Sequence, residues 1–157
     1  MPIIDDVTGL RNVLARSHTL AVVGLSAQWN RPSYFAAKYM QDHGYRIIPV
    51  NPRYSEVLGE KSYPDLRSIG EPVDIVDCFR KSAEIPAISI DAIAIGAKVL
   101  WMQIGIKNDD AARRAVAAGL DVVMNRCVKI EHARILGGLN WAGVNTGIIS
   151  SRRPVAT

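Results

Sequence analysis

The sequence lacks any long apolar run and contains little cysteine. No stretch approaches the roughly 20 consecutive apolar residues of a membrane-spanning helix, and the first residues are acidic where a signal peptide would be basic. The two cysteines, Cys78 and Cys127, form no C-x-x-C pair and have no histidine at zinc-ligand spacing. We therefore expect a cytoplasmic protein with reduced thiols, no metal site and no membrane contact.

Aromatic residues are also few, at 6%, and acidic residues are outnumbered by basic ones. The formal net charge of +4 favours anionic partners. However, the Lys and Arg residues are scattered, without the basic helix, aromatic platform or helix-turn-helix pattern expected for nucleic-acid binding. The remaining composition is typical of one globular domain of 157 residues. We expect no nucleic-acid partner, and a small phosphorylated ligand is consistent with the charge.

Short β-branched runs alternate with helical patterns along the chain. Strands are predicted over 18–23, 46–50, 73–79, 98–102 and 121–124, and helices over 33–43, 82–95, 109–118 and 129–136. Such alternation implies parallel strands joined by right-handed crossovers. We predict an α/β fold, a doubly wound Rossmann-like parallel five-stranded sheet in the order 3-2-1-4-5. A single domain, 1–138, would bind its ligand at the carboxyl ends of the strands.

The connection between the first predicted strand and the following helix has the features of a phosphate-binding turn. A glycine allows a tight turn, and the helix N-terminus offers free N–H groups and a positive dipole end to an anion. Polar side chains can add donors, and proline suits the first helical position. The candidate ligand-binding residues are Gly24, Ser26, Asn30, Arg31, Pro32 and Ser33. One glycine is not a G-x-G-x-x-G pattern, so an ordinary capped turn is the alternative.

The second predicted strand has no acidic residue at its end. An NAD domain has a carboxylate there for the ribose hydroxyls, whereas this chain has Asn51, Pro52 and Arg53. These residues accept a phosphorylated ribose, so coenzyme A and NADP both fit better than NAD. The next two strand ends add the candidates Phe79, Arg80, Met102 and Gln103. The alternative is that the arginines are merely solvated and Asn51 merely ends the strand.

An acid–base pair is also missing from the predicted ligand-binding end of the sheet. His18 precedes the first strand, His43 lies at a helix end and His132 belongs to the last predicted helix. No paired carboxylates and no Ser–His–acid order stand out. We therefore assign no catalytic residue and favour a binding protein. The alternative is an enzyme that uses CoA or NADP in the same cleft.

Six blocks in order resemble a known family: Val-Val-Gly-Leu-Ser (22–26), Asn-Arg-Pro-Ser (30–33), Pro-Val-Asn-Pro-Arg-Tyr (49–54), Asp-Cys-Phe-Arg (77–80), Trp-Met-Gln-Ile-Gly (101–105) and Met-Asn-Arg-Cys (124–127). From about residue 10 to residue 137, the chain resembles the small stand-alone CoA-binding proteins. These are similar to the N-terminal CoA-binding domain of the succinyl-CoA synthetase α-subunit.

The resemblance implies a Rossmann-like domain that binds the pyrophosphate of coenzyme A on the loop after the first strand. The ends of the second, third and fourth strands would hold the rest of the molecule. Ligase activity is not implied, because the phosphorylated histidine and the nucleotide-grasping fold of the synthetase lie in other domains. We expect a non-catalytic protein that binds coenzyme A or an acyl-CoA.

The C-terminal segment, 139–157, lies outside the resemblance and is expected to be partly ordered. Trp141, Ile148 and Ile149 stand there among small and polar residues. Apolar residues on a segment without its own core usually cover another surface. We predict that residues 139–150 pack across the domain or onto a second subunit, most simply in a homodimer. A disordered tail is the alternative.

Overall fold

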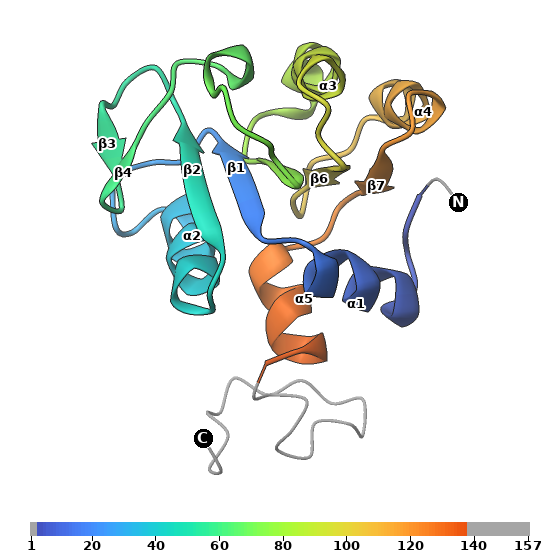
Figure 1. Cartoon of the computed structure of the whole chain (residues 1–157). Helices are drawn as coiled ribbons and strands as arrows, with labels where there is room; N and C mark the ends of the chain where they lie inside the picture. Colours follow the sequence, from blue (N-terminus) through green and yellow to red (C-terminus); the bar gives the residue numbers. More distant parts are fainter. Residues whose placement is uncertain (1–2, 138–157) are drawn as a thin grey trace.

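A parallel sheet of five strands forms the centre of the molecule, in the order β2-β1-β5-β6-β7 (Figure 1). The structure is a computed structural model that describes residues 3–137. The sheet consists of β1 (Thr19–Val23), β2 (Arg46–Val50), β5 (Ile75–Cys78), β6 (Val99–Met102) and β7 (Asp121–Val123). A separate antiparallel hairpin contains β3 (Glu56–Val57) and β4 (Glu60–Lys61). The predicted α/β class with five parallel strands is confirmed.

Helices cover both faces of the sheet (Figure 1). One face carries α1 (Val7–Arg16), α2 (Pro32–Asp42) and α5 (Val128–Ile135), and the other carries α3 (Ile85–Ala94) and α4 (Asp109–Ala117). Two 3-10 turns, η1 (Leu66–Ser68) and η2 (Ser82–Glu84), lie in the connections. Among residues 3–137, no helix has the length and apolar character to span a bilayer.

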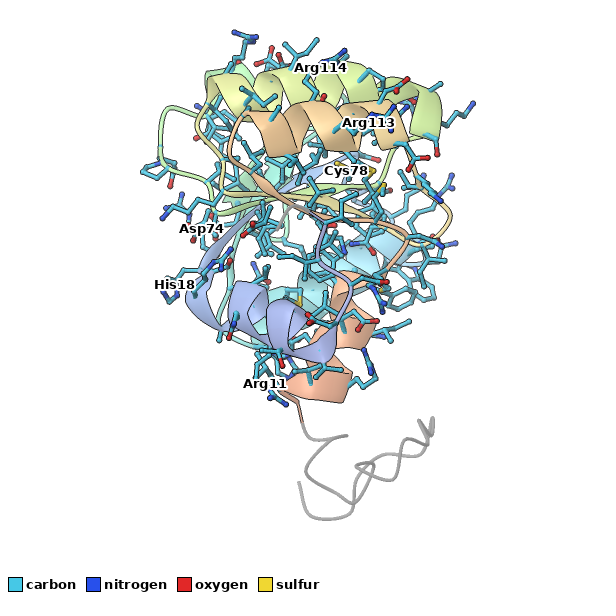
Figure 2. The ribbon with its side chains drawn as sticks, turned by 90° about the vertical axis from the view of Figure 1, so that its right-hand side faces the viewer. Arg11, His18, Asp74, Cys78, Arg113 and Arg114 are labelled. Carbon is cyan, nitrogen blue, oxygen red and sulfur yellow. The ribbon has the colours of Figure 1, made fainter. Side chains whose placement is uncertain are left out.

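Side chains alternate between two apolar cores, one on each face of the sheet. In β1, Leu20 and Val22 pack towards α1, α2 and α5, whereas Ala21 packs towards α3 and α4. Cys78 lies in the second core, between the sheet and the α3–α4 layer (Figure 2). Because both faces are covered, the strands are continuous apolar runs rather than alternating ones. The two cores hold the strand ends, and therefore the connecting loops, in fixed positions.

The predicted strand order, 3-2-1-4-5, is wrong. The third predicted strand, β5, pairs with β1 instead of β2, which makes the order 2-1-3-4-5 when the five strands are numbered along the chain. Pro49 explains the difference, because its carbonyl faces the outer edge of β2 and accepts a hydrogen bond from Tyr63 N at 3.0 Å. Proline has no N–H to offer a further strand on that edge. The strand order therefore reverses between β1 and β5, which makes the end of β5 central.

Two elements were not predicted. Helix α1 is capped by Asp6, whose side chain accepts a hydrogen bond from Gly9 N at 2.8 Å, and the helix buries Leu10, Val13 and Leu14. The β3–β4 hairpin lies in a stretch that has only turn signals in the sequence. The predictions for residues 139–157 fall outside the described residues.

Candidate ligand-binding site

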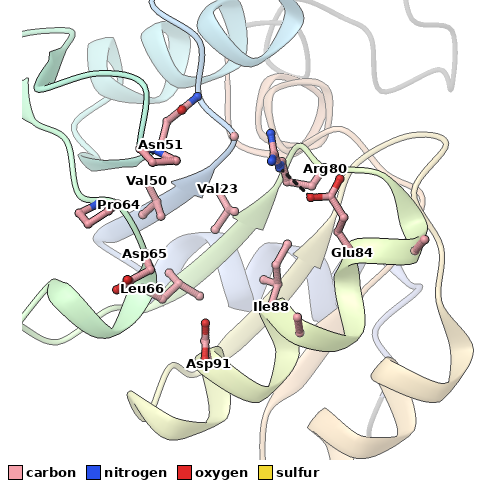
Figure 3. Close-up of a pocket in the computed structure, with 14 residues that line it drawn as sticks. Val23, Val50, Asn51, Pro64, Asp65, Leu66, Arg80, Glu84, Ile88 and Asp91 are labelled. Carbon is pink, nitrogen blue, oxygen red and sulfur yellow. Dashed lines mark hydrogen bonds and ion pairs between the residues drawn. The ribbon is translucent and has the colours of Figure 1, made fainter.

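Two adjoining hollows lie at the carboxyl ends of β1, β2 and β5. The polar hollow, about 440 Å³, lies over the loop between β1 and α2. The apolar hollow, about 490 Å³, lies between the ends of β1 and β2 and helix α3, and its apolar lining includes Val23, Val50, Leu66 and Ile88 (Figure 3). The two hollows share Gly24, Asn51, Pro52 and Arg80. Together they form one cleft along the central strand ends.

Gly24 lets the loop after β1 pass directly against the end of β5. Its φ is +89°, a conformation that favours glycine. A Cβ atom at this position would lie 2.6 Å from the Phe79 carbonyl oxygen and 2.7 Å from Arg80 Cδ. Both distances are too short for real contacts. The predicted glycine therefore sets the width of the cleft between the two strand ends.

Hydrogen bonds within the β1–α2 loop fix its shape. Ser26 N donates to Ser33 Oγ at 3.0 Å, and Gln28 N donates to Ser26 Oγ at 3.0 Å. Ser33 is buried, so its hydroxyl holds the loop, while Arg31 is exposed and donates from Nε to the Gln28 side chain at 3.2 Å. No side chain caps the N-terminus of α2, which begins with Pro32. The positive end of this helix is thus available to an anion in the polar hollow.

The end of β2 is tied to the same loop by Asn51. This buried side chain donates from Nδ2 to the Leu25 carbonyl at 3.1 Å and accepts from Arg53 N at 2.9 Å. Asn51 therefore positions the cleft wall, whereas the side chain of Arg53 is exposed in the polar hollow. Tyr54 also lines this hollow, and a hydrogen bond with Ser26 lowers its pKa.

Arg80 lines both hollows, and its side chain lies beside Glu84 at the apolar hollow (Figure 3). It follows β5, whose end is fixed by a hydrogen bond from Phe79 N to the Val23 carbonyl at 2.9 Å. The Nε atom of Arg80 donates to Glu84 Oε1 at 3.2 Å, and both side chains are close to half exposed. Phe79 lines the polar hollow beside it. The central strand therefore contributes a cation to both hollows.

The charges of the two hollows differ. The lining of the polar hollow includes three arginines, Arg31, Arg53 and Arg80, and no aspartate or glutamate. The apolar hollow has carboxylates at its edge, of which Asp91 pairs with Arg67 at 2.7 Å. Guanidinium groups and an uncapped helix N-terminus suit phosphate. The polar hollow thus has the chemistry of a phosphate site, and the apolar hollow that of a site for an uncharged group.

Three of the predicted ligand-binding residues do not line either hollow: Asn30, Met102 and Gln103. Met102 is fully buried in the core beneath α3 and α4. Gln103 is buried too, and its polar atoms are satisfied inside the protein. Its Nε2 donates to Asp77 and its Oε1 accepts from Val128 N at 3.3 Å. The other ten predicted residues line the cleft, and residue-type reasoning missed Gln28, Tyr54 and Glu84. An i, i+4 spacing from Arg80 was the available signal for Glu84.

Burial raises the pKa values of three titratable groups near the cleft. Burial raises the pKa of Asp77 to about 7, and burial also raises the pKa values of the Cys78 and Cys127 thiols. A raised pKa keeps a thiol protonated and weakly nucleophilic. Within residues 3–137, no group of three or more His, Cys, Asp or Glu side chains is arranged to hold a metal ion.

Residues 18–133 match the protein family described as "CoA binding domain". The chain belongs to this CoA-binding family. It is 41% identical over 124 residues to the Bacillus subtilis (strain 168) protein YneT, covering 79% of this chain and 92% of that protein. A solved structure of a hypothetical protein from Pyrococcus horikoshii OT3 has 40% identity and a TM-score of 0.82, covering 85% of this chain and 94% of that one.

A more distant relative of this CoA-binding domain is an ADP-forming acetate–CoA ligase from Methanocaldococcus jannaschii. The identity is 24% over 70 residues, which is 45% of this chain and 10% of the ligase. The predicted resemblance to stand-alone CoA-binding proteins and to CoA-binding domains of the synthetase type is confirmed.

Proposed function

We propose that this CoA-binding domain binds coenzyme A, or an acyl-CoA, in the cleft at the carboxyl ends of β1, β2 and β5, without catalysing a reaction itself. The main support for this proposal is the positive charge of the polar hollow. Arg31, Arg53 and Arg80 line the polar hollow together with the uncapped N-terminus of α2, and the lining contains no carboxylate. Coenzyme A, with a pyrophosphate and a ribose 3′-phosphate, matches this concentration of positive charge.

The two hollows match the two chemical parts of the nucleotide. The pyrophosphate would lie on the loop from Gly24 to Ser33, where backbone N–H groups and the helix dipole favour an anion. The ribose phosphate would approach Arg53. The uncharged adenine ring would fill the apolar hollow, whose lining includes Val50, Leu66 and Ile88.

The absence of an acidic side chain at the end of β2 supports a ligand with a phosphorylated ribose. A carboxylate there would repel the 3′-phosphate, whereas Arg53 attracts it. The histidines support binding without catalysis, because His18, His43 and His132 all line a small hollow at the opposite end of the sheet. None of these three histidines lines either hollow of the cleft.

Calorimetry with CoA, dephospho-CoA and NAD tests this proposal. CoA should bind more tightly than dephospho-CoA by about 1–3 kcal/mol, the value of a charge-assisted contact. Denaturing the purified protein should also release any CoA or acyl-CoA that co-purified. Mass spectrometry of the released ligand would identify any acyl group. Equal affinities for CoA and dephospho-CoA would remove the role of the 3′-phosphate. Tighter binding of NAD than of CoA would overturn the proposal.

The Ser33→Asp variant tests the phosphate position. Aspartate is favourable in the first turn of a helix, and its carboxylate can accept the hydrogen bond from Ser26 N, so the variant should fold. The same negative charge should repel a phosphate at the N-terminus of α2. Ser33→Asn is the matched control, since it has the same size without the charge. Unchanged CoA affinity in a folded Ser33→Asp variant would show that the phosphates bind elsewhere.

A further inference from the structure

The position of Arg80 allows its guanidinium to bind either of two partners. The Cδ atom of its side chain lies against Gly24, where a Cβ would come within 2.7 Å. The Arg80 side chain lines both the polar and the apolar hollow, and Figure 3 shows its guanidinium paired with Glu84. In the structure it donates to Glu84 Oε1 at 3.2 Å. A phosphate in the polar hollow would offer a competing acceptor to the same group.

Glu84 is free to give up this contact. It precedes α3 without making a side-chain capping hydrogen bond, and Arg80 is its ion-pair partner. The other two carboxylates at the edge of the apolar hollow are engaged elsewhere. Asp91 pairs with Arg67 at 2.7 Å, and Asp65 accepts from Ser68 N at 2.9 Å. Glu84 is therefore the carboxylate that faces a cation of the cleft.

We propose that Glu84 sets the affinity of the cleft for phosphate by competing with the ligand for Arg80. The carboxylate holds the guanidinium in the empty cleft and releases it when a phosphate binds. The exchange is favourable because the pair is half exposed, 46% for Arg80 and 44% for Glu84, and such pairs are weak. A bidentate arginine–phosphate contact is stronger. This inference rests on the proposed function, since it concerns a ligand of the same cleft.

A double-mutant cycle with Glu84→Gln and Arg80→Gln tests the competition, with CoA affinity measured by calorimetry. Removing the competing carboxylate should strengthen CoA binding about two- to fivefold, the equivalent of one exposed ion pair. Arg80→Gln should weaken binding. In the double variant, the gain from Glu84→Gln should disappear because its target is gone. A gain of affinity is a result that mere structural damage does not produce.

Asp110→Asn is the matched control, because Asp110 pairs with Arg113 on α4 and lines neither hollow. It removes the same unit of charge and should leave the CoA affinity unchanged. The inference is overturned if Glu84→Gln has no effect, or if its gain persists in the Arg80→Gln background or appears equally in Asp110→Asn. If the wild-type protein does not bind CoA, the proposed function fails. The same cycle with pyrophosphate as the probe then tests Glu84 by itself.

Discussion

The arginines of the polar hollow and the basic residues at the amino end of the sheet differ in their partners. At the amino end, where the strands begin, basic side chains pair with carboxylates of neighbouring elements: Arg16 with Asp121, Arg46 with Glu71 and Lys98 with Asp74. At the carboxyl end, Arg31 and Arg53 make no ion pair with any residue in the described range, 3–137, and Arg80 pairs with Glu84. The positive charges of Arg31 and Arg53 in the polar hollow are therefore not matched by a carboxylate within the described residues.

Polar backbone and hydroxyl groups show the same contrast. At the amino end, Asp74 accepts hydrogen bonds from His18 N at 2.7 Å and Thr19 N at 3.1 Å (Figure 2). Tyr45 closes this end further by donating to the Leu14 carbonyl at 2.6 Å. At the carboxyl end, the N-terminus of α2 has no side-chain cap. The uncapped helix end is consistent with the ligand position that we propose, whereas the groups at the amino end satisfy one another within the fold.

The largest effect is expected on stability when one glycine at each end of the sheet is replaced by alanine. Gly24→Ala should destabilise the fold by about 2–5 kcal/mol, because alanine meets the Phe79 carbonyl and must adopt a positive φ. Gly44→Ala, at the amino end, has a similar φ of +93° but nothing within 4 Å of its Cβ. It should cost only about 1–2 kcal/mol. Urea unfolding measures both, and equal losses would show that the close approach at Gly24 is unimportant.

A smaller effect concerns the buried carboxyl of Asp77, near the carboxyl end. Its pKa is raised to about 7 by burial, so the folded state binds a proton that the unfolded state has lost. This group therefore reduces stability as the pH rises from about 4 to 7. Asp77→Asn should stabilise the protein by about 2 kcal/mol at pH 8, after the partial cost of burying new amide hydrogens, and not at pH 4. A gain that is independent of pH would contradict this account.

The amino end should show the opposite pH dependence through His132. Burial, with a contribution from His43, lowers the pKa of this imidazole to about 4. The unfolded chain takes up the proton below about pH 6.5, so wild-type stability falls as the pH drops from 6.5 to 4. His132→Gln, which can still form a hydrogen bond with the Tyr39 hydroxyl, should remove about 2 kcal/mol of this acid sensitivity. Unfolding curves that remain equally acid-sensitive in the variant would assign the loss to another group.

Much of the cleft was predictable because its chemistry lies in residues next to strand ends. Gly24, Arg31, Arg53 and Arg80 all follow from the pattern of strand, turn and helix, and all four line the cleft. Gln103 was predicted by the same reasoning but does not line the cleft. It also stands at a strand end, yet its side chain turns inwards to Asp77. A buried acid on the neighbouring strand requires such a partner, and only knowledge of the strand order could reveal it.

The strand order is the main feature that the sequence-based prediction got wrong, although Pro49 already indicated that its strand lies at an edge. A proline in a strand is confined to a sheet edge or a strand end. The predicted order placed its strand inside the sheet, while the structure has it at the edge beside Tyr63. Helix α1 was missed for a different reason, because its buried stripe of Leu10, Val13 and Leu14 is short and lies within a polar stretch.

The smallest effects are expected when one arginine at each end of the sheet is replaced by alanine. Arg53→Ala removes an exposed side chain without an ion pair in the described residues, so stability should change by less than about 0.5 kcal/mol. CoA affinity should fall about tenfold, because a charge-assisted phosphate contact is lost. Arg46→Ala breaks the pair with Glu71 at 2.8 Å, which should cost about 0.5 kcal/mol of stability and leave CoA affinity unchanged. Calorimetry and urea unfolding on both variants measure the four quantities. If Arg46→Ala weakened CoA binding as much as Arg53→Ala, the ligand would be sensing net charge alone, and the division between the two ends would not hold.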